Sequence, residues 1–438
     1  MTSEREAQCF SVPLVGCDGF LLGLEGMMGR AGQGRHVGLS VLKLTGAFST
    51  AALRSAAARF SRSHPLLHAR VRRRHWFGIP EWRAKGPFSD EAVGVYERPG
   101  GLPVEEVCRE LLRAASPEAL RFEVVPRQGG FFVVVKWLHL LLDGRGIELA
   151  LHEIARLAEN PLEAHCVQES WGAAFDLPKT MGERRQKVRP FVDRYNVLKR
   201  LAFKSLGRVA AEPGEARFKT IHFDAAQSAK IRARADHLTG GIFQLPYFFA
   251  VVARAHAAVF AGRGEPTMNY HAAAPVQGRR RGAKHPIFQN QMSQFYFALT
   301  HEEVGDLETA ARSVHSQFGM MARHKVESAF SIMLDWFLRF PSRFYIHLLR
   351  RQTKGAITSF YHSHTGQFMP ETQTFCGAQI SDGWHIPTVS QPPGSGIFFS
   401  ERNRCLTATL SWRGGVLSER EVELMCTRLQ QDLLGGCA

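Results

Sequence analysis

The sequence predicts a mixed α/β fold divided into two lobes. Three observations lead to this fold class: the length, the apolar content, and the alternation of strand-like with helical patterns. The chain has 438 residues, of which 45% are hydrophobic and 22% charged, a composition typical of a globular protein rather than a disordered or fibrous one. Because one domain usually holds ~100–200 residues, this length favours two or three structural units.

The first predicted elements are a strand and two helices. Residues 36–44 form an apolar run typical of a strand. Ser49 then provides an N-cap for a helix whose apolar residues recur at helical spacing. Pro65 ends that helix, and Pro103 suits the first position of the next.

A strand, a turn, a second strand and a helix are predicted next. Residues 120–146 contain two apolar, β-branched runs separated by the Gly129-Gly130 turn, followed by a short loop. Ile147, Leu151 and Ile154 then recur at helical spacing, which predicts a helix with one buried face.

The composition becomes basic between residues 178 and 219. Lysine and arginine alternate there with apolar residues, a pattern of either a solvated helical face or a binding element. We interpret this segment as a crossover. The predicted units are therefore an N-terminal lobe of residues 1–178, a basic crossover of residues 179–218 and a C-terminal lobe of residues 219–438.

The second half begins with a predicted strand at residues 218–223 and two helices at residues 225–238 and 245–262. Two strand-like runs, 269–281 and 288–299, flank a basic loop. Residues 328–351 mix aromatic residues with arginine, which fits either a core helix or a membrane-surface helix. The chain closes with a strand at 405–415 and a helix that begins at a Ser418–Glu421 capping box.

Charge and cysteine content limit the function classes. The formal charge of +15 attracts anions, such as nucleic acid, acidic lipid headgroups, coenzyme A phosphates or an acidic carrier protein. No nucleic-acid-binding motif accompanies it, so we expect no nucleic-acid partner. The eight cysteines form no CxxC pair, which argues against a metal site and a disulfide framework.

The N-terminus and the apolar runs favour a cytoplasmic protein. The first ten residues are acidic in part and contain no apolar run, unlike a secretory signal. The densest apolar stretch, residues 131–142, includes Lys136 and is shorter than the ~20 residues that cross a bilayer.

The residues best suited to chemistry lie in the segment WLHLLLDGRG, residues 137–146. His139 ends a predicted buried strand, and an imidazole with a pKa near ~6.5 can accept a proton from an alcohol or amine that attacks a carbonyl. Asp143 can orient the loop, and Gly144 permits a close approach that a Cβ would block. Taken alone, the pattern also fits a core histidine satisfied by its neighbours.

This segment resembles the condensation-domain and chloramphenicol-acetyltransferase-like superfamily of thioester-dependent acyltransferases, whose signature is HHxxxDG. The second His, the Asp and the Gly of the signature match His139, Asp143 and Gly144. Leu138 replaces the first His, as in BAHD-type members, which keep only HxxxD. The chain is most similar to wax-ester-synthase/diacylglycerol-acyltransferase-like and polyketide-associated members.

Other segments support the resemblance from about Val12 to Leu434. Residues 48–71 are similar to an N-terminal helix followed by an HPxLR element, and PVQGRRRG followed by FQNQMSQFYFAL is similar to the PVxLR and GN segments. The resemblance implies two chloramphenicol-acetyltransferase-like lobes, each a mixed sheet flanked by helices, with a channel between them.

The resemblance also implies a function. An acyl group passes from acyl-CoA or a phosphopantetheinyl carrier-protein thioester to a hydroxyl or amine, with His139 as general base, no covalent intermediate, no permanently bound cofactor and no metal. The alternative is a non-catalytic condensation-like binding module that has lost its activity. The wax-ester-like similarity further suggests peripheral contact with the inner membrane surface.

The remaining site residues follow from the same resemblance. Candidates for binding the substrate and its oxyanion are Ser363, His364 and Thr365 on a channel strand, and Asn290 across the cleft. A surface loop rich in His and Ser is the alternative for residues 359–366.

Two sets of cations have predicted roles. In many relatives the Arg of HPxLR holds the motif Asp; here that position is His68, with Arg70 two residues on. We therefore expect His68, Arg70 or another cation to hold Asp143. The candidates for binding the phosphates of the thioester donor are Arg279, Arg280, Arg281 and Lys284, for which a solvated basic loop is the alternative.

Overall fold

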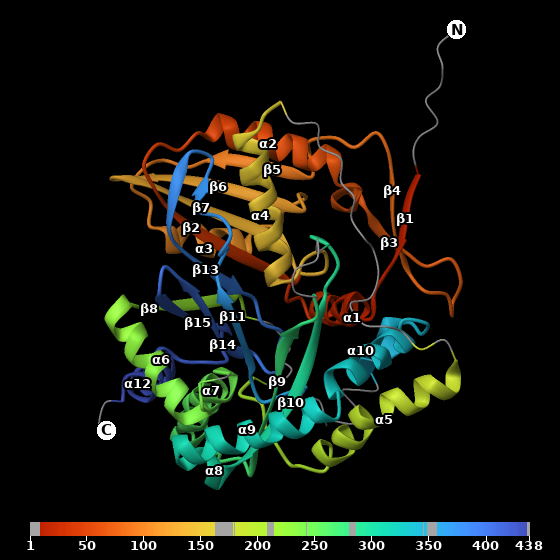
Figure 1. Ribbon diagram of the computed structural model, residues 1–438, viewed down its shortest axis with the longest axis vertical. Coiled ribbons are helices and arrows are strands. Elements are labelled where there is room, and N and C mark those ends of the chain that lie inside the picture. The colour runs from red at the N-terminus through yellow and green to blue at the C-terminus, as the bar shows by residue number, and fades with distance from the viewer. Residues whose placement is uncertain are drawn as a thin grey trace.

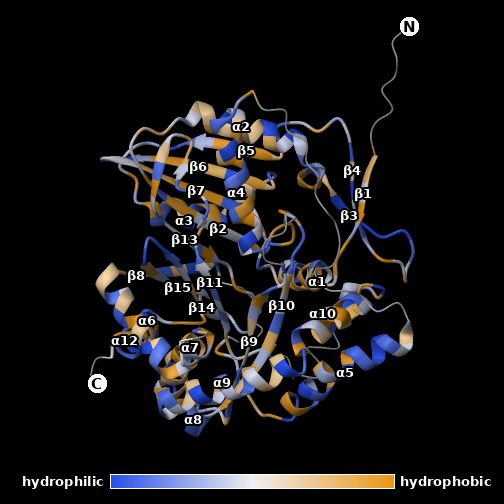
Figure 2. Cartoon of the chain, viewed as in Figure 1, coloured by the Kyte–Doolittle hydropathy of each residue, from blue (hydrophilic) through white to orange (hydrophobic). Residues whose placement is uncertain are grey.

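Two lobes, each built on a β-sheet, meet at the middle of the molecule (Figure 1). This computed structural model describes residues 9–162, 178, 180–207, 214–241, 243–279, 286–344, 346–347 and 357–435. Helices cover the sheets, and apolar residues gather between helices and sheets in both lobes (Figure 2). The predicted two-lobed α/β fold is confirmed.

The N-terminal lobe contains a six-stranded mixed sheet. Its strands, in spatial order, are β12 (Thr374–Phe375), β13 (Ala378–Pro387), β2 (Val37–Thr45), β7 (Gly130–Leu138), β6 (Leu120–Arg127) and β5 (Val93–Glu97). Only β5 and β6 pair in parallel. The helices α2 (Thr50–Ser63) and α4 (Gly144–Glu159) pack on one face, and α3 (Val104–Arg113) packs on the other. The buried middle strand β7 leads directly to His139.

The C-terminal lobe contains a four-stranded sheet and a long hairpin. The sheet order is β11 (Tyr361–Gln367), β14 (Ser395–Arg402), β15 (Cys405–Arg413) and β8 (Ala216–Phe223), and the hairpin consists of β9 (Asn269–Gln277) and β10 (Met292–Thr300). The hairpin lies beside β11, where His271 O accepts a hydrogen bond from Ser359 N at 2.6 Å. The covering helices are α6 (Ala225–Thr239), α7 (Leu245–Gly262), α8 (His301–Gly305), α9 (Leu307–Arg323) and α12 (Glu419–Leu434).

Helix α7 forms the centre of this lobe. Among the described residues it is the one helix long and apolar enough to cross a membrane. Its Tyr247, Phe248 and Phe249 are completely buried among neighbouring helices and strands. We therefore assign α7 to the protein core.

The lobe boundary predicted at residue 219 is wrong for one segment. Strands β12 and β13 follow that boundary in sequence, yet they belong to the sheet of the N-terminal lobe. β13 pairs antiparallel with β2, with Trp384 opposite Val41. The exchange covers the edge of β2, whose main-chain groups would otherwise be unpaired.

The basic crossover and the aromatic segment 328–351 pack together. The crossover forms α5 (Met181–Leu198), which lies against α10 (Val326–Phe337). In α10, Val326, Ala329 and Phe330 are buried. For the described part of segment 328–351, this packing favours the core-helix interpretation over a membrane-surface helix.

Residues 9–30 contact both lobes. β1 (Cys9–Pro13), β4 (Glu81–Lys85) and β3 (Arg70–Arg72) form a small sheet, and α1 (Gly16–Arg30) packs on α10. A Cβ on Gly16 would lie 2.5 Å from Asp335 N, so only glycine permits this approach between the two helices.

Candidate active site

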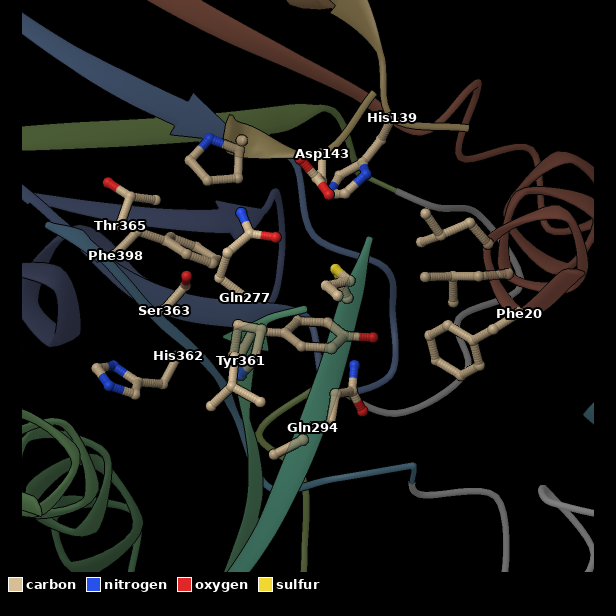
Figure 3. A pocket seen from close by; sticks show the side chains of 18 of the residues that line it. Phe20, His139, Asp143, Gln277, Gln294, Tyr361, His362, Ser363, Thr365 and Phe398 are labelled. Carbon is tan, nitrogen blue, oxygen red and sulfur yellow. The ribbon is translucent and has the colours of Figure 1, made fainter. Parts of the chain in front are cut away.

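His139 lies in the turn between β7 and α4. Its backbone N–H donates a hydrogen bond to His36 O at 3.0 Å, which fixes the turn to the start of β2. The half-buried side chain lines a cavity of about 690 Å³ to which both lobes contribute (Figure 3). The imidazole is therefore placed where two substrates can meet.

The environment of His139 favours a neutral ring. Burial lowers the pKa of His139 below its usual 6.5, because a charged ring loses its hydration there. A contact with its own backbone, the Asp143 carboxylate and the Asn290 side chain oppose this shift. Nδ1 is buried without a hydrogen-bond partner in the described part of the chain, so the ring presents Nε2 to the cavity. A neutral imidazole with Nε2 exposed suits a general base.

A second histidine stacks on this ring. The ring centroids of His36 and His139 are 4.6 Å apart with 22° between their planes, and Trp137 lies on another side with its centroid at 5.2 Å. Burial, and secondarily the nearby His139, lower the pKa of His36 well below 6.5, so both imidazoles are neutral together. Sequence reasoning missed His36, because no local pattern marks a residue 103 positions before His139.

Asp143 forms its hydrogen bonds with the loop and with the residues around it, rather than with the His139 ring. It caps α4 by accepting a hydrogen bond from Gly146 N at 2.7 Å, and it accepts another from Gln291 N at 2.9 Å. Nη1 of Arg279 lies 2.7 Å from both carboxylate oxygens, and the two side chains are only 2% and 6% exposed. The ion pair ties the His139 loop to the hairpin of the other lobe.

This pair corrects the predicted roles of several cations. His68 instead hydrogen-bonds Ser61 O at 3.0 Å and stacks on Phe88, while Arg70 is exposed on β3 opposite Arg83. Of the three predicted alternatives, neither His68 nor Arg70 holds Asp143, and the other cation is Arg279. Since its guanidinium is used by Asp143, Arg279 cannot serve as a phosphate ligand. Arg280, Arg281 and Lys284 lie outside the described residues.

The close approach predicted at Gly144 occurs at Gly146. A Cβ on Gly144 would lie 3.6 Å from Thr365 Cγ2, an ordinary contact. On Gly146 it would lie 2.5 Å from Ile287 O and 3.3 Å from Arg279 Nη2. The glycine that the Asp143–Arg279 contact requires is thus Gly146, whereas Gly144 contributes to the cavity wall.

Asn290 lies behind the base rather than in the cavity lining. Its Nδ2 donates to Asp18 Oδ1 and Leu140 O, both at 3.0 Å, and its backbone N–H also donates to Asp18 Oδ1. Burial raises the pKa of Asp18 to about 6, although these hydrogen bonds counteract part of the shift. The predicted contact of Asn290 with substrate is therefore replaced by a role in positioning the loop that carries His139.

Strand β11 places all three predicted residues at the cavity. Ser363, His364 and Thr365 line it, and Figure 3 shows Ser363 and Thr365 across the cavity from His139. Thr365 Oγ1 donates to Phe399 O at 3.2 Å, and His364 Nε2 lies 3.7 Å from Glu401 Oε1. Within the described chain, the Ser363 hydroxyl makes no hydrogen bond to protein and is available to a ligand.

The cavity has a second, apolar region away from β11. Its wall is formed by α1, α5 and α10, through side chains that include Phe20, Phe191, Phe330 and Met333. In Figure 3, Phe20 points into the cavity from the side opposite Ser363. Polar and apolar groups of a ligand can therefore be accommodated at different ends of one space.

Comparisons with known proteins identify the fold. No protein-family model matches the sequence, and a search of curated proteins finds no relative. Among solved structures, a trichothecene 15-O-acetyltransferase from Fusarium sporotrichioides is similar over 97% of this chain and 95% of its own, with a TM-score of 0.73 at 12% identity. The first condensation domain of the CDA synthetase matches over 97% and 96%, with a TM-score of 0.68 at 15% identity.

A third match is polyketide synthase associated protein 5 from Mycobacterium tuberculosis, which is similar over 91% of this chain and 94% of its own, with a TM-score of 0.60 at 14% identity. All three superpositions span both lobes. The chain therefore has the two-lobed fold of condensation domains and chloramphenicol-acetyltransferase-like acyltransferases.

Proposed function

We propose that this protein is an acyltransferase that moves an acyl group from a thioester to a hydroxyl or amine. The observation that carries the proposal is the position of His139, whose Nδ1 is buried and whose ring lines a cavity between the two lobes. The lowered pKa of this ring keeps it neutral near pH 7, so a ring nitrogen is free to accept a proton.

The proposed reaction needs no covalent acyl-enzyme. The acceptor O–H or N–H donates its proton to Nε2 of His139 while its oxygen or nitrogen attacks the thioester carbonyl. The tetrahedral intermediate collapses, the C–S bond breaks, and the thiolate takes the proton from the imidazolium. The products are an ester or amide and a free thiol, and His139 returns to its neutral form.

Neighbouring groups support each step. Stacking on His36 holds the His139 ring in one orientation, and the Asp143–Arg279 pair fixes the turn that carries it. Ser363, with its hydroxyl free on the facing strand, is the proposed donor to the developing oxyanion, a contact worth ~3 kcal/mol in other enzymes.

The donor that we propose is acyl-CoA or a phosphopantetheinyl thioester on a carrier protein. The similar structures include an epimerization domain of tyrocidine synthetase and an EpoB cyclization-docking bidomain, both parts of synthetases. The net charge of +15 suits either anionic donor. We also propose a cytoplasmic location.

Release of free thiol tests the proposal. The protein is incubated with acyl-CoA and acyl-pantetheine donors of increasing chain length, with and without panels of alcohols and amines. We expect thiol release that depends on the acceptor, with the matching ester or amide found by mass spectrometry. No release with any pair, or release that ignores the acceptor, would contradict acyl transfer.

A non-catalytic binding module is the second candidate, because Leu138 stands in place of the first signature histidine. Such a module would bind an acyl thioester in the same cavity without turning it over. Calorimetric binding together with an intact thioester after prolonged incubation with acceptors would favour this candidate.

A further inference from the structure

The apolar region of the cavity, which we call the arm, has strand β9 along one side. Along β9, Tyr270, Ala272 and Ala274 face the core, whereas alternate residues face the cavity. The cavity-facing positions include the small Ala273, which lies opposite Tyr296 of β10, and Pro275, which lies opposite Gln294. Helices α1, α5 and α10 form the facing wall.

His271 is an unpartnered polar group in this arm. It lines the cavity and is only 7% exposed, and both its ring nitrogens are buried without a hydrogen-bond partner among the described residues. The ring stacks on Tyr296, with their centroids 5.9 Å apart. Because a buried polar atom without a hydrogen-bond partner destabilises the folded state, two such atoms on one ring need an explanation.

The backbone holds this histidine in place. His271 O accepts hydrogen bonds from Ser359 N and Thr358 Oγ1, both at 2.6 Å, and His271 N donates to Ser359 Oγ at 3.1 Å. These hydrogen bonds fix the main chain and stacking on Tyr296 orients the ring, while the ring nitrogens remain unused, which is the arrangement expected of a group that binds a ligand.

The chemistry of the ring defines the ligand group. Burial, and secondarily Arg194, lower the pKa of His271 to about 4, so the ring is neutral at pH 7 and has one donor and one acceptor nitrogen. A hydroxyl can match either nitrogen and a keto oxygen can match the donor. A carboxylate can only accept, so it matches the donor nitrogen alone, and burying its charge among mostly apolar side chains has a high desolvation cost.

Strand β9 sets the length of the arm. Gln277 lies six residues after His271 on the same strand, which corresponds to ~20 Å of extended backbone. Gln277 Oε1 accepts hydrogen bonds at 3.1 Å from the N and Nη1 of Arg279, the residue that holds Asp143. The arm thus runs along β9 from the neighbourhood of Asp143 to His271.

We infer that the arm binds an extended apolar substrate group that carries a hydroxyl or keto oxygen, which hydrogen-bonds His271 at ~20 Å from the end of the arm near Asp143. This inference rests on the proposed function only for calling the ligand a substrate. The binding site itself follows from the cavity lining and the two unpartnered nitrogens.

Direct binding tests the inference without turnover. Primary alcohols and α,ω-diols from octane to hexadecane compete with anilinonaphthalene sulfonate, a fluorescent apolar probe, for the full-length protein. We expect the affinity for long diols to exceed that for the matching alcohols by about 10-fold, because a long diol forms one more hydrogen bond. A primary alcohol or a short diol can place a hydroxyl at only one end of the arm at a time, whereas a diol that spans the arm can bind His271 and the polar end near Asp143 together. Short diols should therefore show no such advantage.

Three variants complete the experiment. His271→Leu should remove the diol advantage, His271→Gln should keep part of it, and His315→Leu, which changes an exposed histidine of α9 outside the cavity lining, should leave it unchanged. Thermal unfolding identifies any variant that fails to fold. If a variant does not fold, the dependence of the wild-type affinity on diol length tests the inference instead.

Equal affinities for diols and alcohols in the wild type would overturn the inference and indicate that water satisfies His271. A diol advantage that persists in His271→Leu would also overturn it. If thioester transfer occurs without any diol advantage, the proposed function stands and this inference falls. If a diol advantage occurs without any thioester transfer, this inference stands and the proposed function falls.

Discussion

The ion pair between Arg279 and Asp143 gives the most demanding prediction. In Arg279→Met, a side chain of similar length replaces the guanidinium and leaves the Asp143 carboxylate buried without its cation. The pair is almost inaccessible, with Nη1 2.7 Å from both carboxylate oxygens, and Nε of Arg279 also donates to Pro286 O at 3.1 Å. Removing one partner of such a pair typically costs ~3–5 kcal/mol.

A double-mutant cycle separates the pair from its surroundings. We expect Arg279→Met to lower the free energy of unfolding by ~3–5 kcal/mol in urea titrations. Asp143→Asn removes the uncompensated charge, so the double variant should be destabilised by less than the sum of the single changes, with a coupling of ~2 kcal/mol. Because the pair also fixes the His139 turn, acyl transfer should fall by ~100-fold or more.

Two controls make this result specific. Arg312→Met breaks an exposed pair with Glu308 on α9 and should cost less than about 1 kcal/mol. Arg70→Met changes the cation that sequence reasoning considered for Asp143, and it should leave transfer intact. If Arg279→Met costs no more than Arg312→Met, or if the cycle shows no coupling, the reasoning about the loop is refuted.

Three further predictions concern the histidines. Because burial lowers the pKa of His139, the acidic limb of the kcat/KM profile should have its midpoint below pH 6.5, and a midpoint above that value would contradict a buried base. His36→Phe keeps a stacked ring and should retain most of kcat, whereas His36→Ala should lose ~10-fold; equal losses would exclude a stacking role. The pKa values of His256, His271 and His362 are lowered by burial to about 4, 4 and 3. Below pH ~6.5 the unfolded chain therefore binds more protons at these histidines than the folded chain does. The folded state keeps its full stability above pH ~6.5 and loses stability as the pH falls towards 4, by ~2 kcal/mol for each histidine at pH 5. Urea unfolding at pH 7 and pH 5 measures this loss, and equal stabilities would contradict it.

Local signals predicted the regular elements well. Ser49 and Ser418 cap α2 and α12 as their side-chain chemistry suggests, and the apolar run of residues 245–262 matches α7. In contrast, α1 was not predicted, because its five glycines lower helix propensity. Those at Gly16 and Gly19 instead serve close packing on α10.

The candidate site was predictable only where one segment carries it. His139, Asp143 and Gly144 occur in ten consecutive residues, so pattern and resemblance find them. His36 and Arg279 reach the same place from positions just outside β2 and β9, far away in sequence. The exchange of β13 between lobes depends on the free edge of β2. Such contacts depend on tertiary packing, and a single sequence contains no local signal for them.

His139→Ala tests most directly whether His139 accepts the proton of the acceptor. Wild type and variant are compared for acceptor-dependent thiol release with the best thioester, after equal thermal stability is verified. The account predicts a fall in kcat of ~100- to 10,000-fold, the contribution typical of general-base catalysis. Turnover by His139→Ala close to the wild-type rate would contradict the account.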